Sequence, residues 1–580
     1  MPKDRPKARR KKTTPSAPAS SPTLPTLSPR VTWLALAVIA AIWIVIRVRL
    51  LSIPLERDEG EYAYAGQLIL AGVPPYTLIY NMKFPGIYYA YALVMGLFGQ
   101  TVIGIHVGLL LVNIGALVML FLIARRLFDP VVGLVAAAAY GFLTVNQSIL
   151  GTQAHATHFV ILPALAGILL ALRAVETRKI STPFWSGCLI GVAVTMKQQG
   201  VFFAAFVFLF LLLSYWRDAK DPAGRPGQQS RAVTARLLAF AGGAALPLLL
   251  IGAVLYASGV FGKFWYWAVR YAAAYVSEVP LQAGLLNGYR NTVTMIASSW
   301  PVWIFAPCGL LLVWLDRQSR GRAWWVTGFL IAGFLTVCPG FYFRPHYYVT
   351  WMPAIALLIG VGIGASRTRL LERGQPSLAL LPVGLFALAL LVTLFVPLQP
   401  PAPAHRAFLF DAPVASASQM MYGENPWPEA RRVADYVRLH STPDETVAVL
   451  GSEPEIYFFA GRKSATGFIY TYPLMEPQAF ASDMQKDMIR EIEASKPKFV
   501  VFVNVWMSWL STQRSDMSIF KWAFQKYLPD HYLPVGYIPP RRTGEADIWG
   551  QDAEQHPMHG LGDGAIYVFE RTTPVAGKTF

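Results

Sequence analysis

Hydrophobic runs alternate with short polar segments from residue 31 to residue 396. A helix that crosses a bilayer needs about twenty consecutive apolar residues, and about eleven of these runs approach that length. The pattern predicts a polytopic α-helical membrane protein with about eleven transmembrane helices. The predicted spans are 31–49, 101–124, 130–149, 157–173, 183–196, 200–216, 237–256, 297–315, 323–339, 347–365 and 376–396.

One apolar segment does not fit this series. The stretch "GIYYAYALVMGLFG" (86–99) is too short to span and is rich in tyrosine, so we interpret it as a helix at the membrane interface. Lys and Arg accumulate in cytoplasmic loops. With a cytoplasmic N-terminus and an interfacial 86–99, the basic loops all fall on the cytoplasmic side. These loops contain Arg125 and Arg126, Arg173 with Arg178 and Lys179, and the segments 217–236, 316–322 and 367–374.

The pattern changes after residue 396. The stretches "TVAVLGS", "KFVVFVNV" and "GAIYVFE" predict strands, whereas "PWPEARRVADYVRLH" and "AFASDMQKDMIREIEAS" predict helices. Strands that alternate with helices indicate an α/β domain. With eleven spans before it, this domain (397–580) is predicted to be extracytoplasmic, and residues 31–396 are predicted to form the transmembrane catalytic module.

The composition agrees with a membrane protein. The chain is 54% hydrophobic and 14% charged, with a mean hydropathy of +0.41, whereas soluble domains carry about 25% charged residues. The net charge of +17 includes the opening "MPKDRPKARRKK", so residues 1–30 are predicted to be a disordered basic cytoplasmic tail near anionic lipid. Basic residues so placed favour membrane lipids over nucleic acid as partners. The cysteine spacing fits neither a disulfide framework nor a zinc site.

The first external loop, residues 50–100, carries the charged residues that suggest chemistry. In "ERDEGEYAYAGQLILAGVPPYTLIYNMKFPG", Asp58 and Glu61 match a capping box that would open a helix at 59–71. A carboxylate at this surface also suits a catalytic base, and Lys83 suits a contact with a lipid phosphate. Glycosyl transfer from a lipid-phosphate sugar needs both groups, a base for the acceptor's proton and a cation for the departing phosphate.

The same stretch, from "RDEGEYAYAGQLILAGVPPY" to "NMKFPGIYYAYALVMGLFG", resembles the GT-C superfamily of membrane glycosyltransferases. It is most similar to the branch that contains protein O-mannosyltransferases and lipid A aminoarabinose transferases, and the likeness covers about residues 31–365. The resemblance implies a GT-C fold, a polyprenyl-phosphate sugar donor and inversion at the anomeric carbon. It also implies Asp58 as the catalytic carboxylate, Glu59 as its neighbour and Lys83 as a donor-phosphate contact.

Further candidates lie in other external segments. Lys197 is at a turn between two predicted spans, where an ionisable residue is a functional candidate. Lys197, Arg344 and His346 are candidate contacts for the donor phosphate, and "RPHYYVTWMP" around the last two also resembles a GT-C feature. In the second external loop, "LGTQAHATHF", His155 and His158 stand where many relatives carry an acidic residue, so they are candidate acceptor-side residues. Their spacing permits a divalent metal, but no third ligand is evident, and we assign neither a metal nor a cofactor.

Several charged or polar residues keep two interpretations. Arg47 and Arg49, at the outer end of the first span, either await an anion or reach the interface with their long side chains. Glu453, Arg462 and Tyr470 either face the acceptor or form contacts within the folded outer domain.

These features favour a glycosyltransferase of the bacterial inner membrane. It would move a sugar from a polyprenyl-phosphate carrier to a lipid, glycan or protein acceptor outside the cytoplasm, with Asp58 as base. The alternative is a transporter or flippase of a lipid-linked saccharide, but the ionisable residues gather at the outer surface and no inverted repeat is visible. A membrane-anchored scaffold that acts through residues 397–580 is a third hypothesis.

Overall fold

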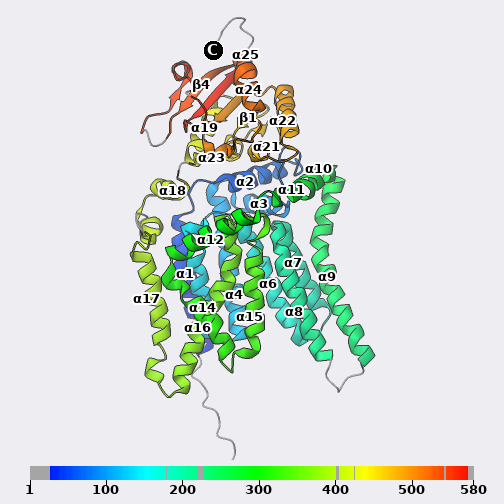
Figure 1. Ribbon diagram of the computed structural model, residues 1–580, viewed down its shortest axis with the longest axis vertical. Helices are drawn as coiled ribbons and strands as arrows, with labels where there is room; N and C mark the ends of the chain where they lie inside the picture. Colours follow the sequence, from blue (N-terminus) through cyan, green and yellow to red (C-terminus); the bar gives the residue numbers. More distant parts are fainter. Residues whose placement is uncertain are drawn as a thin grey trace, which may run out of the picture.

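The computed structural model describes residues 27–177, 179–219, 226–399, 404–423, 425–540, 544–558 and 560–572. Upright helices form a bundle, and a sheet with its own helices stands on one end of that bundle (Figure 1). Most of the predicted tail, residues 1–30, lies outside the described residues. The first described element, α1 (Pro29–Arg49), begins near the end of that range.

Within the described part of the chain, seven helices are long and apolar enough to cross a membrane. An eighth crossing arises if α12 (Leu281–Ser298) and the helical segment 300–315, bent by 98° at their junction, count as one span. The seven correspond to α1, α4 (Val102–Leu127), α6 (Ala156–Thr177), α8 (Val201–Ala219), α9 (Pro226–Ala257), α16 (Met352–Glu372) and α17 (Leu381–Phe395).

Three predicted spans contain shorter helices. α5 (Pro130–Leu143) has 14 residues, and α7 (Ser181–Met196) and α15 (Arg320–Leu335) have 16 each. A helix of 14 residues rises about 21 Å, which is less than the hydrocarbon thickness of about 30 Å. α5 nevertheless packs among α1, α4 and α16 inside the bundle. The count of eleven spans therefore stays a prediction.

The segment 86–99 forms a short helix, α3 (Gly86–Phe98), as predicted. With α2 (Arg57–Leu70) it lies across the end of the bundle, between the upright helices and the sheet (Figure 1). Other short helices at this level are α10 (Phe261–Trp265), α11 (Ala272–Val276) and α18 (Val414–Tyr422). The segment 300–315 consists of α13 (Trp300–Trp303) and α14 (Phe305–Leu315), and α14 packs against α16 inside the bundle.

A six-stranded sheet of order β2-β1-β3-β6-β4-β5 forms the core of the second unit, here called the α/β unit (residues 427–572). β1 (Thr446–Leu450), β2 (Lys463–Ser464) and β3 (Phe499–Val503) are parallel. β6 (Ile566–Arg571), β4 (Tyr532–Ile538) and β5 (Ile548–Trp549) continue the sheet in antiparallel pairs. Parallel strands are usually buried on both faces, and the apolar residues of β3 are all buried.

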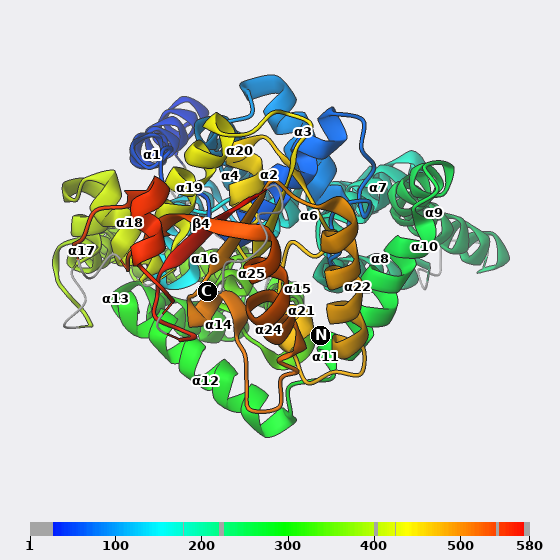
Figure 2. The ribbon, with the colours of Figure 1, turned by 90° about the horizontal axis from the view of Figure 1, so that it is seen from above.

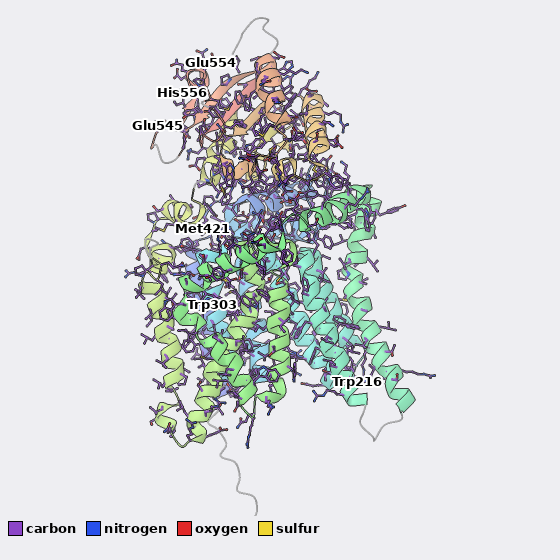
Figure 3. The ribbon with its side chains drawn as sticks, viewed as in Figure 1. Trp216, Trp303, Met421, Glu545, Glu554 and His556 are labelled. Atoms are coloured by element: carbon purple, nitrogen blue, oxygen red, sulfur yellow. The ribbon has the colours of Figure 1, made fainter. Side chains whose placement is uncertain are left out.

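Helices lie on both sides of this sheet when the molecule is seen from above (Figure 2). In Figure 3, Glu545, Glu554 and His556 mark the α/β unit, Met421 marks the level where it meets the bundle, and Trp216 marks the opposite end of the bundle. The helices of the unit are α19 (Trp427–Leu439), α20 (Glu455–Ala460), α21 (Tyr472–Met475), α22 (Ala481–Ser495), α23 (Trp506–Trp509), α24 (Ser518–Trp522) and α25 (Leu528–His531).

The α/β unit packs directly on α2. A Cβ atom at Gly60 would lie 2.6 Å from the backbone nitrogen of Glu455, so only glycine permits this approach. Four residues further along α2, the Tyr64 hydroxyl accepts a hydrogen bond from the Ser464 backbone nitrogen at 2.7 Å. The first external loop therefore lies between the bundle and the α/β unit.

The predicted start of α2 is wrong by two residues. Glu56 is the N-cap, and Glu56 and Glu59 form the reciprocal capping box that we expected of Asp58 and Glu61. This shift places Asp58 in the first turn of the helix, where its carboxylate is free for other partners. The favourable position of an acid at a helix N-terminus is retained.

Candidate active site

A central cavity of about 400 Å³ lies where the bundle meets the α/β unit. Its walls come from α2 and the loop after it, the turn between α7 and α8, the segments 268–276 and 344–347, and the α/β unit. The predicted site residues that line it are Asp58, Lys83, Lys197, Arg344 and His346.

Asp58 has one engaged oxygen and one open oxygen. Lys83 Nζ donates to Oδ1 at 2.7 Å, and the Tyr470 hydroxyl donates to the same oxygen at 3.0 Å. The nearest histidine nitrogens to Oδ2 are His155 Nδ1 at 3.8 Å and His346 Nε2 at 3.7 Å, both beyond hydrogen-bond distance. Burial alone would raise the pKa of Asp58, but the Lys83 ammonium and the two histidines hold it well below its usual range. Asp58 is therefore an ionised carboxylate at neutral pH.

Lys83 is shared between two carboxylates. Besides Asp58, it donates to Glu61 Oε2 at 2.7 Å, and Asn81 and Tyr88 donate to the same Glu61 carboxylate. Burial opposes the charge of Lys83, but Asp58 and Glu61 raise its pKa above the usual value. The structure thus places Lys83 in the cavity, as predicted, with its charge balanced by the protein itself.

Two other cations face the cavity without such partners. Among the described residues, neither Lys197 nor Arg344 forms an ion pair with a carboxylate. The Lys197 ammonium lies 3.9 Å from the centre of the Tyr347 ring, and the Arg344 guanidinium lies 5.4 Å from that of Tyr342. Burial, supported by the neighbouring cations, lowers the pKa of Lys197 to about 7. These two side chains are suited to an anionic ligand.

Glu59 and His158 do not join the cavity. Glu59 is fully buried, where it pairs with His106 Nε2 at 2.9 Å and accepts hydrogen bonds from the backbone of Glu56 and Ala154. His158 Nδ1 lies 3.1 Å from Asn113 Oδ1 inside the bundle. Glu59 therefore joins α2 to the second external loop, and of the two loop histidines only His155 approaches Asp58.

Arg47 and Arg49 bind backbone carbonyls of the protein. Arg47 donates to the carbonyl of Thr144 at 2.9 Å, and Arg49 donates to that of Phe408 at 2.9 Å. Neither an awaited anion nor a side chain that only reaches the interface is therefore needed to explain these residues, because both form structural hydrogen bonds. These two long side chains at the end of a membrane helix satisfy backbone carbonyl groups of neighbouring segments with hydrogen bonds.

The partnership of Lys83 with Glu61 was not predicted from the sequence. The spacing of Asp58 and Glu61 puts both on one face of α2, but the same spacing also fits a capping box. The contacts of Arg57 were not predicted either: its Nε donates to the Ser452 carbonyl at 2.6 Å, and its Nη2 pairs with Glu453 at 3.1 Å. No local pattern predicts that contact, since its partners are about 400 positions away.

A metal-like arrangement is present around Asp58. Asp58, His155 and His346 offer ligand atoms that all lie within 4.8 Å of one another, and neither ring nitrogen of His155 has a hydrogen-bond partner among the described residues. Such a set could hold a divalent ion with one position open. However, the Lys83 ammonium already supplies positive charge to this carboxylate at 2.7 Å. We therefore assign no metal to this group.

An apolar groove of about 470 Å³ lies next to the central cavity. It is lined by Phe84, Thr195, Leu248, Tyr256, Phe264 and their neighbours on α9 and α10. The two cavity lysines and two groove residues are close along the chain, since Phe84 follows Lys83 and Thr195 precedes Lys197 by two positions.

Comparison with known proteins gives a family match over part of the chain and a similar fold. Residues 82–224 match the family described as dolichyl-phosphate-mannose-protein mannosyltransferase. Among solved structures, ArnT from Cupriavidus metallidurans bound to undecaprenyl phosphate is similar at 14% identity and a TM-score of 0.52, over 82% of this chain and 94% of that one. Its apo form gives 15% identity and a TM-score of 0.51, with the same coverage.

The oligosaccharyltransferase of Archaeoglobus fulgidus aligns at 14% identity and a TM-score of 0.49, over 90% of this chain and 74% of that one. A search of curated proteins found no match. At such identities the likeness to ArnT shows the fold, and the family match adds the segment that begins at the central cavity and runs through the bundle. Together they support the resemblance to GT-C membrane glycosyltransferases that the sequence indicated.

Proposed function

We propose that the chain transfers a sugar from a polyprenyl-phosphate carrier to an acceptor outside the cytoplasm, with Asp58 as the catalytic base. The observation that carries this proposal is the presence, in one cavity, of an ionised carboxylate with an open oxygen and of two cations that form no ion pair with any described carboxylate. The ArnT structure contains undecaprenyl phosphate, and we extend that class of lipid to this chain. We also propose a bacterial inner-membrane location, with the N-terminus in the cytoplasm and the cavity on the opposite side.

The base is the Oδ2 atom of Asp58. It takes the proton of the acceptor's nucleophile as that nucleophile attacks the anomeric carbon and the bond from this carbon to the phosphate oxygen breaks. Attack from the face opposite the phosphate inverts the anomeric configuration. Oδ1 serves a different role, because its hydrogen bonds to Lys83 and Tyr470 hold the carboxylate in place.

Lys197 and Arg344 bind the donor phosphate, with His346 at the edge of the same site. A departing phosphate gains negative charge, and cations in a water-poor site stabilise that charge strongly. Lys83 is less suited to this task, since Asp58 and Glu61 already balance its charge. Its role in the proposed reaction is to orient the base.

We expect kcat/KM for the lipid donor to fall as the pH rises through about 7. Burial lowers the pKa of Lys197 to about 7, so the free enzyme carries this charge below that pH and loses it above. The variant Lys197→Arg keeps its charge and should retain donor binding at higher pH. Profiles of kcat/KM against pH for both proteins test this, and identical alkaline limbs would contradict it.

The apolar groove is proposed to hold the first isoprene units of the carrier. Gly252 lies in the groove, and a Cβ atom there would meet only one atom, at 4.0 Å. A Gly252→Phe variant should therefore fill the groove and raise the KM of a long-chain donor about tenfold. A tenfold change corresponds to about 1.4 kcal/mol of binding free energy, slightly less than the burial of two methylene groups at ~0.8 kcal/mol each. A short-chain donor should be affected less.

Gly242→Phe is the matched control for the groove. Gly242 lies on the same helix, α9, and a Cβ atom there would meet no atom within 4 Å, but it does not line the groove. Its KM should stay at the wild-type value for donors of either length. The proposal that the groove holds the donor lipid would be wrong if both substitutions changed the KM equally, or if the change did not depend on the length of the donor's lipid chain.

The proposed function is tested with the purified chain in liposomes that contain a labelled polyprenyl-phosphate sugar. We expect release of free polyprenyl phosphate together with a labelled acceptor when envelope extract is added. Movement of the labelled lipid across the bilayer without this release would instead favour the flippase hypothesis. Hydrolysis that releases the labelled sugar into water at a rate independent of the acceptor would contradict the proposed transfer.

A further inference from the structure

One side chain of the α/β unit reaches the base itself. The Tyr470 hydroxyl donates to Asp58 Oδ1 at 3.0 Å, although the two residues are 412 positions apart. The Tyr470 side chain is 5% exposed, and its ring centre lies 5.3 Å from the Lys83 ammonium. Tyr470 therefore contacts both members of the ion pair at the centre of the cavity.

Contacts within the α/β unit fix the position of Tyr470. The next residue, Thr471, donates from its backbone nitrogen to Ser452 Oγ at 3.0 Å and from its hydroxyl to the Ser508 carbonyl at 2.9 Å. Ser452 follows β1, and Ser508 follows β3. The carboxyl edge of the two central parallel strands thus determines where the tyrosine hydroxyl points.

The same edge holds the residue before Asp58. The Arg57 guanidinium is anchored by the Ser452 carbonyl and by Glu453, and its charge lies 4.9 Å from the Tyr472 ring centre and 5.5 Å from that of Trp427. All of these partners belong to the α/β unit. The unit consequently controls both the chain at Asp58, through Arg57, and one oxygen of its carboxylate, through Tyr470.

A single cation does not select one carboxylate oxygen. The terminal torsion of an aspartate is broad, and the Lys83 ammonium has three donors and can follow either oxygen. A second donor from a fixed direction removes this freedom, because Oδ1 then satisfies both Lys83 and Tyr470 only in one orientation. In that orientation Oδ2 has no hydrogen bond from the described residues and faces the two histidines at 3.7–3.8 Å.

We propose that the α/β unit is an integral part of the catalytic site and that Tyr470 is its positioning residue. Tyr470 fixes Oδ1 of Asp58, so that Oδ2 accepts the acceptor's proton. This inference rests on the proposed role of Asp58 as base. It assigns a catalytic task to the α/β unit that is separate from any binding of acceptor by the same unit.

Tyr470→Phe tests the proposal, because phenylalanine keeps the ring over Lys83 and removes only the hydroxyl. We expect kcat to fall about 10- to 100-fold while the KM of the donor changes less than about twofold. The acid limb of the pH profile should move to higher pH, because the ionised form of Asp58 loses a hydrogen-bond donor. A purely structural role would lower the unfolding temperature without moving that limb.

Tyr64→Phe is the matched control. Its hydroxyl is also buried and also bonds the α/β unit, to the Ser464 nitrogen, but it does not touch Asp58. We expect wild-type kcat and a wild-type acid limb from this variant. Equal losses in both variants would show that docking of the α/β unit, and not positioning of Asp58, is what the hydroxyl provides, and would overturn the proposal.

A second variant keeps the test decisive if Tyr470→Phe folds poorly. Thr471→Val removes the hydroxyl that ties this segment to Ser508, and it should lower kcat and shift the acid limb in the same direction by a smaller amount. Wild-type values in the folded variants would overturn the proposal. If the wild-type chain itself shows no sugar transfer, the proposed function fails. If the wild-type chain transfers sugar and Tyr470→Phe transfers it equally well, only the role of Tyr470 fails.

Discussion

Replacing Asp58 with asparagine should reduce sugar transfer by about 10²- to 10⁴-fold, the range that a general base supplies. Asparagine has nearly the same shape as aspartate, but its amide cannot take a proton at Oδ2. Lys83 would keep its second carboxylate, Glu61, at 2.7 Å, so the substitution leaves no unpaired buried cation. We therefore expect normal membrane insertion and an unfolding temperature close to that of the wild type. Initial rates with a labelled lipid donor, normalised to folded protein, measure the loss.

Glu59→Gln is the informative comparison, because the sequence resemblance also pointed to this residue. Glu59 is buried in contact with His106 and the backbone of Ala154, away from the cavity. Its substitution should lower stability, since a buried polar partner is lost, and should change kcat per folded molecule less than tenfold. Near wild-type transfer by Asp58→Asn would remove Asp58 as the base. A larger kcat loss in Glu59→Gln than in Asp58→Asn would transfer that role to Glu59.

The sequence predicted the elements of the bundle well where a single long apolar run decides the outcome. α1 and α4 lie within three residues of the predicted spans, and α16 lies within seven. The short helix 86–98 was separated from the spans by its length, by its tyrosines and by the placement of the basic loops. It predicted less well where a helix is apolar but short. α5 ends at Leu143 because the chain turns at Thr144, and such an end depends on contacts such as the hydrogen bond from Arg47 to the Thr144 carbonyl.

The sequence singled out several residues that line the cavity, but it did not predict which of them contact one another. Asp58, Lys83, Lys197, Arg344 and His346 were all singled out, and the structure brings them to one cavity. Two signals led to these residues: a charged residue at the end of an apolar run is unusual enough to be noticed, and the motifs around Asp58, Lys83 and Arg344 resemble GT-C sequences.

The partnerships depend on distances along the chain that no local pattern contains. Lys83 meets Asp58 and Glu61 across 25 and 22 positions, and Tyr470 meets Asp58 across 412. In the proposed mechanism these contacts make Lys83 an orienting group and leave Lys197 and Arg344 to bind the phosphate. The capping box was misplaced for a different reason. Glutamate is a less usual N-cap than aspartate, yet Glu56 caps α2.

Lys83→Met should affect both stability and activity, because it leaves two carboxylates without their common cation. Glu61 is fully buried, and removing one partner of a buried pair costs about 3–5 kcal/mol. The pKa values of Asp58 and Glu61 should both rise. Because a larger fraction of Asp58 would then be protonated, transfer at neutral pH should fall about 100-fold, with partial recovery as the pH rises. Lys263→Met, which removes a lysine bonded to Tyr80 outside the cavity, should leave transfer unchanged.

The sign of the pH effect on stability separates this explanation from simple misfolding. In the variant, Glu61 has a higher pKa folded than unfolded, so the folded state binds more protons in that window and stability decreases as the pH rises. The difference in unfolding temperature between the wild type and Lys83→Met should therefore be largest at alkaline pH and should shrink as the pH falls toward the unfolded pKa of glutamate. Thermal unfolding in detergent across this range measures it. A difference that does not depend on pH would mean that Lys83 stabilises the loop through packing alone, and the orienting role given to its charge would be wrong.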